Sequence, residues 1–141
     1  MKKNLIAKIT LGALLCASII PAAASTHYKT LPLNSSNAIL QPHQQVTDMG
    51  YRAKNHDDKE VAILAKSMQG TTKVDMRALD ANGNSVLDWK SISTYSGWQN
   101  CTIHPVDGTV IQKGSPIDMQ LRDHYDHKTT SYITDGELDY Q

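Results

Sequence analysis

Four side chains suited to ligand binding crowd around Gly97: Tyr95, Trp98, Gln99 and Asn100. Binding loops use this mixture, because aromatic rings give rigid contact area and amides give adaptable hydrogen bonds. An aromatic plane suits the apolar face of a sugar ring, and amides suit its hydroxyl groups. The stretch therefore predicts a ligand-binding site. The alternative is that Trp98 begins a strand and fills the core, as aromatic residues more often do.

A second cluster, Asp123-His124-Tyr125-Asp126-His127, places imidazoles and carboxylates within five residues. His124, Asp126 and His127 are ligand types that zinc accepts, which makes zinc the one cofactor the sequence offers. Residues three apart on a strand point to opposite faces, so only a loop or a helical turn brings the two imidazoles together. The alternative is a surface loop, where such residues are common.

Cys101 and His104 invite a thiol-nucleophile interpretation, but on a strand they too face opposite ways. A buried, structural cysteine with no partner in its own chain is the expectation. The sequence has no Gly-rich phosphate loop, no G-x-S-x-G elbow and no H-E-x-x-H motif. These observations favour a protein that is not an enzyme.

The elements that position these residues are predicted to be strands. Residues 73–79 and 85–92 flank Asn82-Gly83, a strong signal for a hairpin with a type I′ turn. With that turn at the tip, opposite charges pair on one face and apolar residues on the other. The predicted pairs are Leu79–Val86, Arg77–Asp88 and Asp75–Lys90 on the first face, and Ala78–Leu87, Met76–Trp89 and Val74–Ser91 on the second.

The rest of the chain also has the character of strands. Residues 57–70 fit a capped helix, but their polar–apolar alternation and β-like flanks favour a strand over 60–66. Ile117, Met119 and Leu121 alternate with polar residues, which indicates one buried face. Further strands are predicted at 28–33, 51–54, 109–112, 129–134 and 137–140, with a turn at Asp135-Gly136. Short strands with frequent turns predict a mostly-β fold: a small antiparallel β-sandwich, immunoglobulin-like or jelly-roll-like, with at most one short helix.

The N-terminus has the pattern of a secretory signal peptide. Lys2 and Lys3 precede an apolar run, and Ala22 and Ala24 fit the small-residue cleavage site, so the predicted cut follows Ala24. The run is too short and interrupted for a membrane span. Leu15 before Cys16 argues against a lipoprotein. The short, lysine-started signal is typical of bacteria and predicts a periplasmic or secreted protein, with an irregular arm at 25–45 and the sandwich at 46–141.

Charge limits the partners of the predicted mature chain, residues 25–141. Without Lys2, Lys3 and Lys8 it has 11 basic against 14 acidic residues, a net charge of −3. It lacks the basic stripe that nucleic acids or anionic membranes require. The leading hypothesis is a non-enzymatic binding module for a glycan or a protein. The alternatives are a metal-binding or catalytic protein that uses the 123–127 loop, and a subunit of a larger secreted assembly. The sequence is compatible with a homo-oligomer and with a hetero-oligomer.

Overall fold

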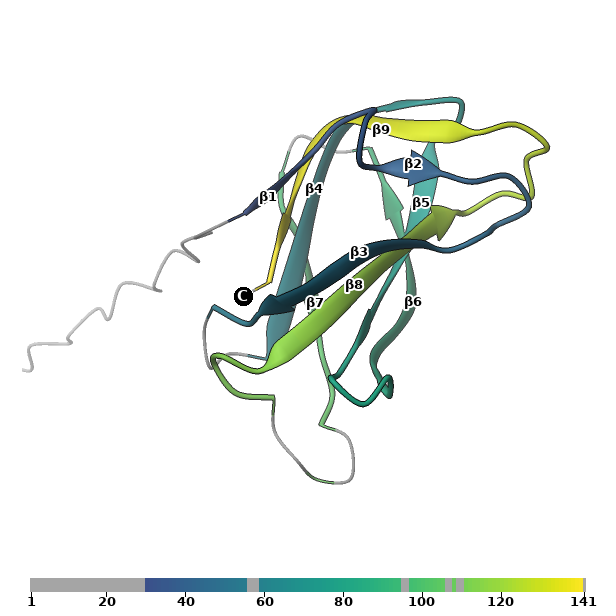
Figure 1. Ribbon diagram of the computed structural model, residues 1–141. Helices are drawn as coiled ribbons and strands as arrows, with labels where there is room; N and C mark the ends of the chain where they lie inside the picture. Colours follow the sequence, from purple (N-terminus) through teal and green to yellow (C-terminus); the bar gives the residue numbers. More distant parts are fainter. Residues whose placement is uncertain (1–29, 56–58, 95–96, 106–107, 109–110, 141) are drawn as a thin grey trace, which may run out of the picture.

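Two antiparallel β-sheets pack face to face in the computed structural model, which describes residues 30–55, 59–94, 97–105, 108 and 111–140 (Figure 1). This described part of the chain contains no helix. The predicted β-sandwich is therefore confirmed. No helix among these residues is long and apolar enough to cross a membrane.

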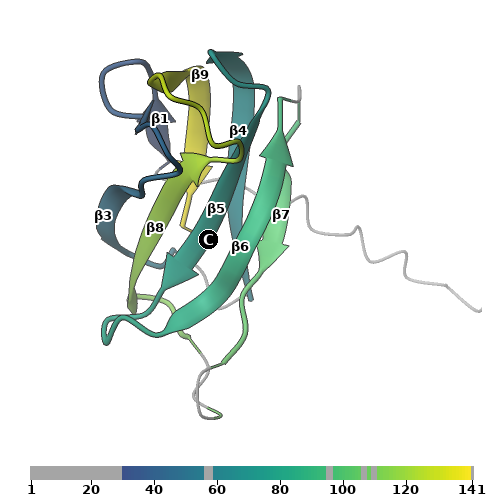
Figure 2. The same ribbon diagram turned by 90° about the vertical axis from the view of Figure 1, so that its right-hand side faces the viewer.

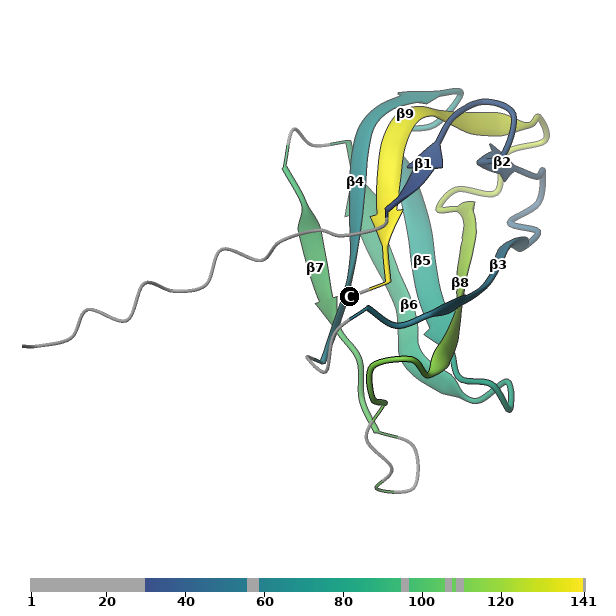
Figure 3. The same ribbon diagram turned by 60° about the vertical axis from the view of Figure 1, so that its left-hand side comes forward.

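The five-stranded sheet has the order β1-β9-β4-β7, with β2 also paired to β9 (Figure 3). Its strands are β1 (Leu31–Leu33), β2 (Ile39–Leu40), β4 (Glu60–Gln69), β7 (Gln99–Thr102) and β9 (Ser131–Asp139). Residues 57–70, which also fitted a helix, thus contain a strand, β4, as the sequence analysis favoured. Within the predicted arm, residues 31–33 form a strand where one was predicted at 28–33, and residues 39–40 form a strand that was not predicted.

The four-stranded sheet has the order β3-β8-β5-β6 and faces the viewer in Figure 2. Its strands are β3 (Thr47–Ala53), β5 (Lys73–Leu79), β6 (Ser85–Ser93) and β8 (Pro116–Asp123). Side chains alternate between the two faces of a strand. Val74, Met76 and Ala78 of β5 point into the core, so Asp75 and Arg77 point outward.

The core lies between the sheets and consists of aliphatic residues with Met, Cys101 and Tyr140. From the four-stranded sheet, Met76, Met119 and Leu121 are fully buried, and from the five-stranded sheet so are Ile63 and Ile133. Burial of such side chains contributes about 1.5–3 kcal/mol each, which is how this chain forms a core without Phe.

The β5–β6 hairpin forms, but its turn differs from the prediction. A type I′ turn needs positive φ at both central residues. Gly83 has φ 83°, whereas Asn82 does not have a positive φ. The turn instead spans Asp80 to Gly83, with the Gly83 amide donating to the Asp80 carbonyl at 3.0 Å. The Asp80 carboxylate holds this turn by accepting from the Asn82 and Asn84 amides.

The predicted hairpin register is wrong beyond Ala78–Leu87, because β6 contains a β-bulge. Asp88 and Trp89 together lie opposite Arg77, so Met76 pairs with Lys90 rather than Trp89. An extra residue reverses the face of every side chain after it. Nearer the turn, a second irregularity pairs Leu79 with Ser85 instead of Val86. The first bulge turns Ile92 into the core, and it leaves Trp89 on the outer face beside Arg77.

The last strand, β9, is continuous where a turn was predicted at Asp135-Gly136. It pairs with β4 on both sides of an irregularity at Asp135. A Cβ at Gly136 would lie 2.3 Å from the Leu64 carbonyl oxygen, so glycine lets the two backbones approach here. The strand predicted at 109–112 lies partly outside the described residues, and Ile111 and Gln112 at its end are not in a strand.

A second bulge, in β3, shapes the outer face of the four-stranded sheet. Asp48 pairs with Gln120 and Tyr51 pairs with Asp118, although Met49 and Gly50 lie between the first residues of these pairs. Gly50 takes φ 80°. Because of this extra residue, Asp48 and Tyr51 share the outer face despite being three positions apart.

Candidate ligand-binding face

The outer face of the four-stranded sheet holds a tryptophan against two arginines. The guanidinium carbons of Arg77 and Arg122 lie 4.6 and 4.2 Å from the Trp89 ring centroid, which is cation–π distance. The three residues come from β5, β8 and β6, and all are partly exposed. We call them, together with Asp75, Gln120 and His124, the Trp89 cluster.

Asp75 fixes the position of Arg122. Its Oδ2 accepts from Nε and Nη2 of Arg122, both at 3.2 Å, while its Oδ1 lies 2.8 Å from Nδ1 of His124. The Asp75 side chain is nearly buried, and charge-assisted hydrogen bonds in such surroundings are the stronger kind. Asp75 thus balances the charge of Arg122 and orients His124.

Arg77 is held by an amide rather than by a carboxylate. Its Nε donates to Oε1 of Gln120 at 2.8 Å, and Nε2 of Gln120 donates to Oδ2 of Asp118 at 2.8 Å. Within the described residues, no carboxylate pairs with Arg77, and its terminal nitrogens have no hydrogen-bond acceptor. The arginine therefore brings an unbalanced positive charge to the sheet surface.

A carboxyl pair stands at the far end of this hydrogen-bonded row. Asp118 is 1% exposed, and among the described residues its Oδ1 has no hydrogen-bond partner. Burial and the neighbouring Asp48 carboxyl raise the pKa of Asp118 to about 6. Because an ionised Asp48 is only an acceptor, the two carboxyl groups hydrogen-bond to each other only when one carries a proton.

Ser91, His124 and Asp75 have the residue types of a nucleophilic triad but not its geometry. The Ser91 hydroxyl lies 3.3 Å from Nδ1 of His124, the same nitrogen that faces Asp75. A proton relay needs the serine on one ring nitrogen and the carboxylate on the other. This group therefore orients His124 and does not activate Ser91.

The predicted binding residues lie at the start of β7, next to the end of β6. Trp98 is partly buried, and Nε2 of Gln99 donates to the Ser93 carbonyl at 2.9 Å. Asn100 is exposed and donates from Nδ2 to Oε2 of Glu60 at 3.0 Å. Tyr95 lies outside the described residues. The two amides are thus close in the chain, but each already has a partner within the fold.

The predicted zinc ligands do not converge on one point. Nδ1 of His124 faces Asp75, Nδ1 of His127 faces Asp123 at 2.9 Å, and Asp126 pairs with His43 at 3.0 Å. In the described part of the chain, no three His, Cys, Asp or Glu side chains are grouped as a metal site. The geometry gives the zinc prediction no support.

Asp123 instead anchors the 123–127 loop from a buried position. It accepts from the Thr71 hydroxyl, the Tyr125 amide and His127, at 2.9 to 3.0 Å. Burial alone would raise the pKa of Asp123. The Ser131 hydroxyl beside the carboxylate and the three hydrogen bonds lower the pKa below its usual value. These hydrogen bonds to Asp123 give the loop a fixed structure.

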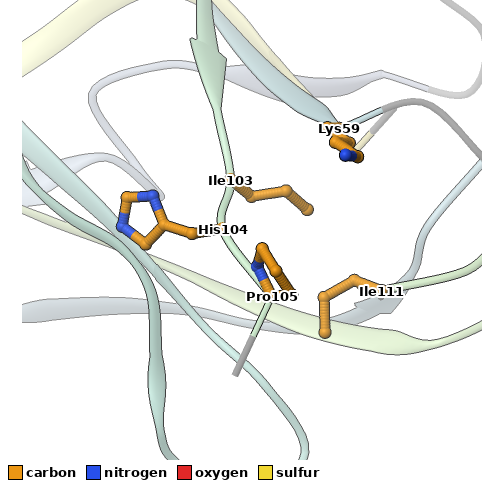
Figure 4. A pocket seen from close by; sticks show the side chains of 5 residues that line it. All are labelled: Lys59, Ile103, His104, Pro105 and Ile111. Carbon is orange, nitrogen blue, oxygen red and sulfur yellow. The ribbon is translucent and has the colours of Figure 1, made fainter. Parts of the chain in front are cut away.

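Cys101 is buried and free, as predicted, and burial raises its pKa. His104, by contrast, is exposed. Figure 4 shows its ring pointing away from the apolar side chains of Ile103, Pro105 and Ile111, which line a small pocket below Lys59. The thiol and the imidazole therefore do not form a reactive pair.

Sequence reasoning missed the Trp89 cluster because it placed Trp89 in the core opposite Met76. One signal was present: the predicted register left Ser91 on the apolar face and Ile92 on the polar face. A β-bulge at Asp88 and Trp89 returns Ile92 to the apolar face and Ser91 to the polar face, and it also places Trp89 on the outer face.

Comparisons with known proteins identify no family. No protein-family model and no curated protein matches the sequence. Among solved structures, the chain is similar to a xylan-binding module CBM15, with 9% sequence identity and a TM-score of 0.45, over 78% of this chain and 95% of that chain.

Proposed function

We propose that this protein is an exported, non-enzymatic binding module that recognises a glycan on the outer face of its four-stranded sheet. The Trp89 cluster carries the proposal. Its partly exposed indole, with guanidinium groups against the ring, gives a flat surface edged by fixed donors and acceptors. Such a surface matches a sugar ring, which has apolar faces and hydroxyl groups around its rim.

A glycan fits the described surface better than a protein partner does. The large apolar side chains most exposed among the described residues are Val46, Tyr51 and Tyr125. Tyr51 shares the outer face and the Tyr125 ring contacts His124, so aromatic rings on this face lie among polar groups. Stable protein interfaces have an apolar centre, and a contiguous apolar patch usually marks them. The polar Trp89 cluster lacks that character.

The β6–β7 turn is proposed as an extension of the same site. Gln99 ties the start of β7 to Ser93 at the end of β6, the strand that carries Trp89. Tyr95, Trp98 and Asn100 would then contact further sugar units. Export rests on the signal-peptide pattern of residues 1–24, and the mass of the exported protein, which should begin at Ser25, checks it.

Substitution of the two tryptophans tests the site. We expect Trp89→Ala to weaken glycan binding by about 1–3 kcal/mol, the scale of a central aromatic contact, with Trp89→Phe retaining part of the affinity. Tyr132→Ala, on the other sheet, is the matched control. Affinity electrophoresis over a glycan panel followed by calorimetry measures these effects, with thermal unfolding confirming that each variant folds. Loss with Trp98→Ala alone would move the site to the turn, and no binding to any glycan would refute the function.

A further inference from the structure

The charge of the Trp89 cluster indicates which glycans it selects. Arg122 is balanced by Asp75 through two hydrogen bonds to one carboxylate oxygen. Arg77 has no such partner among the described residues, because the only acceptor of its guanidinium is the Gln120 amide oxygen, on Nε. Within the cluster, therefore, one arginine charge is not paired with a carboxylate.

The free donors of Arg77 are also fixed in place. The guanidinium carbon of Arg77 lies 4.6 Å from the Trp89 ring centroid, and the hydrogen bond to Gln120 fixes the Nε side of the group. A guanidinium with one edge occupied still offers N–H groups in a planar fork, which matches the two oxygens of a carboxylate. Holding the fork rigid before binding reduces the entropy that the ligand contact must overcome.

The neighbouring groups set where an anion can sit. The nearest carboxyl along the row is Asp118, and Gln120 separates it from Arg77 by bonding to both. On the other side, Nε2 of His124 has no partner within the described chain, while Nδ1 is held by Asp75. The free nitrogens of Arg77, on β5 beside the Trp89 ring of β6, are therefore where an anionic group meets the face.

We propose that the Trp89 cluster binds a glycan that bears carboxylate groups, a uronic acid polymer, through a bidentate contact with Arg77. This rests on the proposed function. The sugar ring lies against the aromatic–guanidinium surface, its carboxylate accepts from the free nitrogens of Arg77, and its hydroxyl groups meet His124 and Ser91.

The test compares charged polymers with their own neutral forms. Polygalacturonate, alginate and hyaluronate are each paired with the carboxyl-reduced polymer, and dextran sulfate serves as a second anion. The mature protein should bind at least one uronate and lose about tenfold or more in affinity on carboxyl reduction. Added salt should weaken the uronate complex more than the neutral one.

Variants assign the effect to the arginine. Arg77→Gln should weaken uronate binding about tenfold more than it weakens binding of the reduced polymer, and Arg77→Lys should restore part of that difference. Lys66→Gln, which removes an exposed cation on the other sheet, should change neither. Equal affinity for both forms of every polymer, or preference for dextran sulfate over all uronates, would overturn the inference and leave glycan binding standing. Binding to no polymer would overturn both.

Discussion

Asp118 illustrates how a single buried carboxyl group makes the stability of the fold depend on pH. Its pKa in the fold, about 6, lies above the value of about 3.9 for an unfolded chain. The folded state therefore binds the proton more tightly, and this contribution to stability is present below about pH 4 and lost as the pH rises through 6.

Asp118→Asn should accordingly stabilise the protein at pH 8 and change little at pH 4. The asparagine keeps an acceptor for Gln120 and replaces the repelling carboxylate with a donor toward Asp48. We expect a gain of about 1 kcal/mol at pH 8, discounted because Asp48 is exposed and screened. Urea unfolding at both pH values measures it, and Asp135→Asn is the exposed control. An equal effect at the two pH values would contradict the carboxyl pair.

The contribution of Asp123 to stability depends on pH in the opposite direction. Hydrogen bonds hold its pKa below the unfolded value, so its contribution is present above about pH 4 and lost as the pH falls through the folded pKa. Asp123→Asn should cost about 2 kcal/mol at pH 7, since bonds to a buried charge are broken, and flatten the acid side of the stability profile. Asp126→Asn, on the same loop but 73% exposed, should cost little. Similar losses from both variants would show that Asp123 is no special anchor.

Individual residues were only partly predictable from the sequence. The burial of Cys101 follows from its type, but the partners of His124 and Asp75 do not, because they are 49 positions apart. Contacts of that range depend on which strands become neighbours. The zinc prediction required a loop that brings His124, Asp126 and His127 together, and each of these side chains contacts a different partner instead.

At the scale of elements, strands were predictable and their irregularities were not. Apolar alternation correctly identified β4, β5, β6 and β8, and the Asn-Gly pair correctly placed the hairpin. A bulge adds one residue, and its only trace in the sequence was the misplaced Ser91–Ile92 pair, so the register prediction failed in β6. The turn type failed separately, because the Asp80 side chain holds a different turn. Because Trp89 reaches the surface through that bulge, the error in one element concealed the site.

Gly136 tests the close approach of β9 and β4. Gly136→Ala would place a methyl group against the Leu64 carbonyl oxygen, and one of the two strands must shift. We expect a loss of about 1–3 kcal/mol in unfolding free energy, the range of overpacked sites. Gly114→Ala is the comparison, since its Cβ would meet open space and only its positive φ is strained, at about 1 kcal/mol. A loss at Gly136 no larger than at Gly114 would contradict the packing argument.

In the whole molecule, the two sheets have different roles. The strands of the five-stranded sheet supply core residues and pair mainly around β9 and β4, while the four-stranded sheet turns its polar outer face to solvent. The sandwich class could be predicted because alternation and turn spacing are properties of the entire chain. The contribution of residues 31–40 could be predicted only in part: a strand at 28–33 was expected, but β2 has two residues and leaves no periodicity.

Truncation measures that contribution. A chain of residues 46–141 lacks β1 and β2 and leaves one edge of β9 unpaired, and it also loses the buried side chains of Leu33, Ala38 and Leu40. Burial of two leucines alone is worth about 3–6 kcal/mol, which is most of the stability of a marginal domain. We expect this chain to unfold or aggregate at room temperature, whereas residues 30–141 should melt cooperatively. Circular dichroism and size-exclusion chromatography distinguish the two results. If both chains share one Tm, the first two strands are dispensable, and the sandwich begins at residue 46.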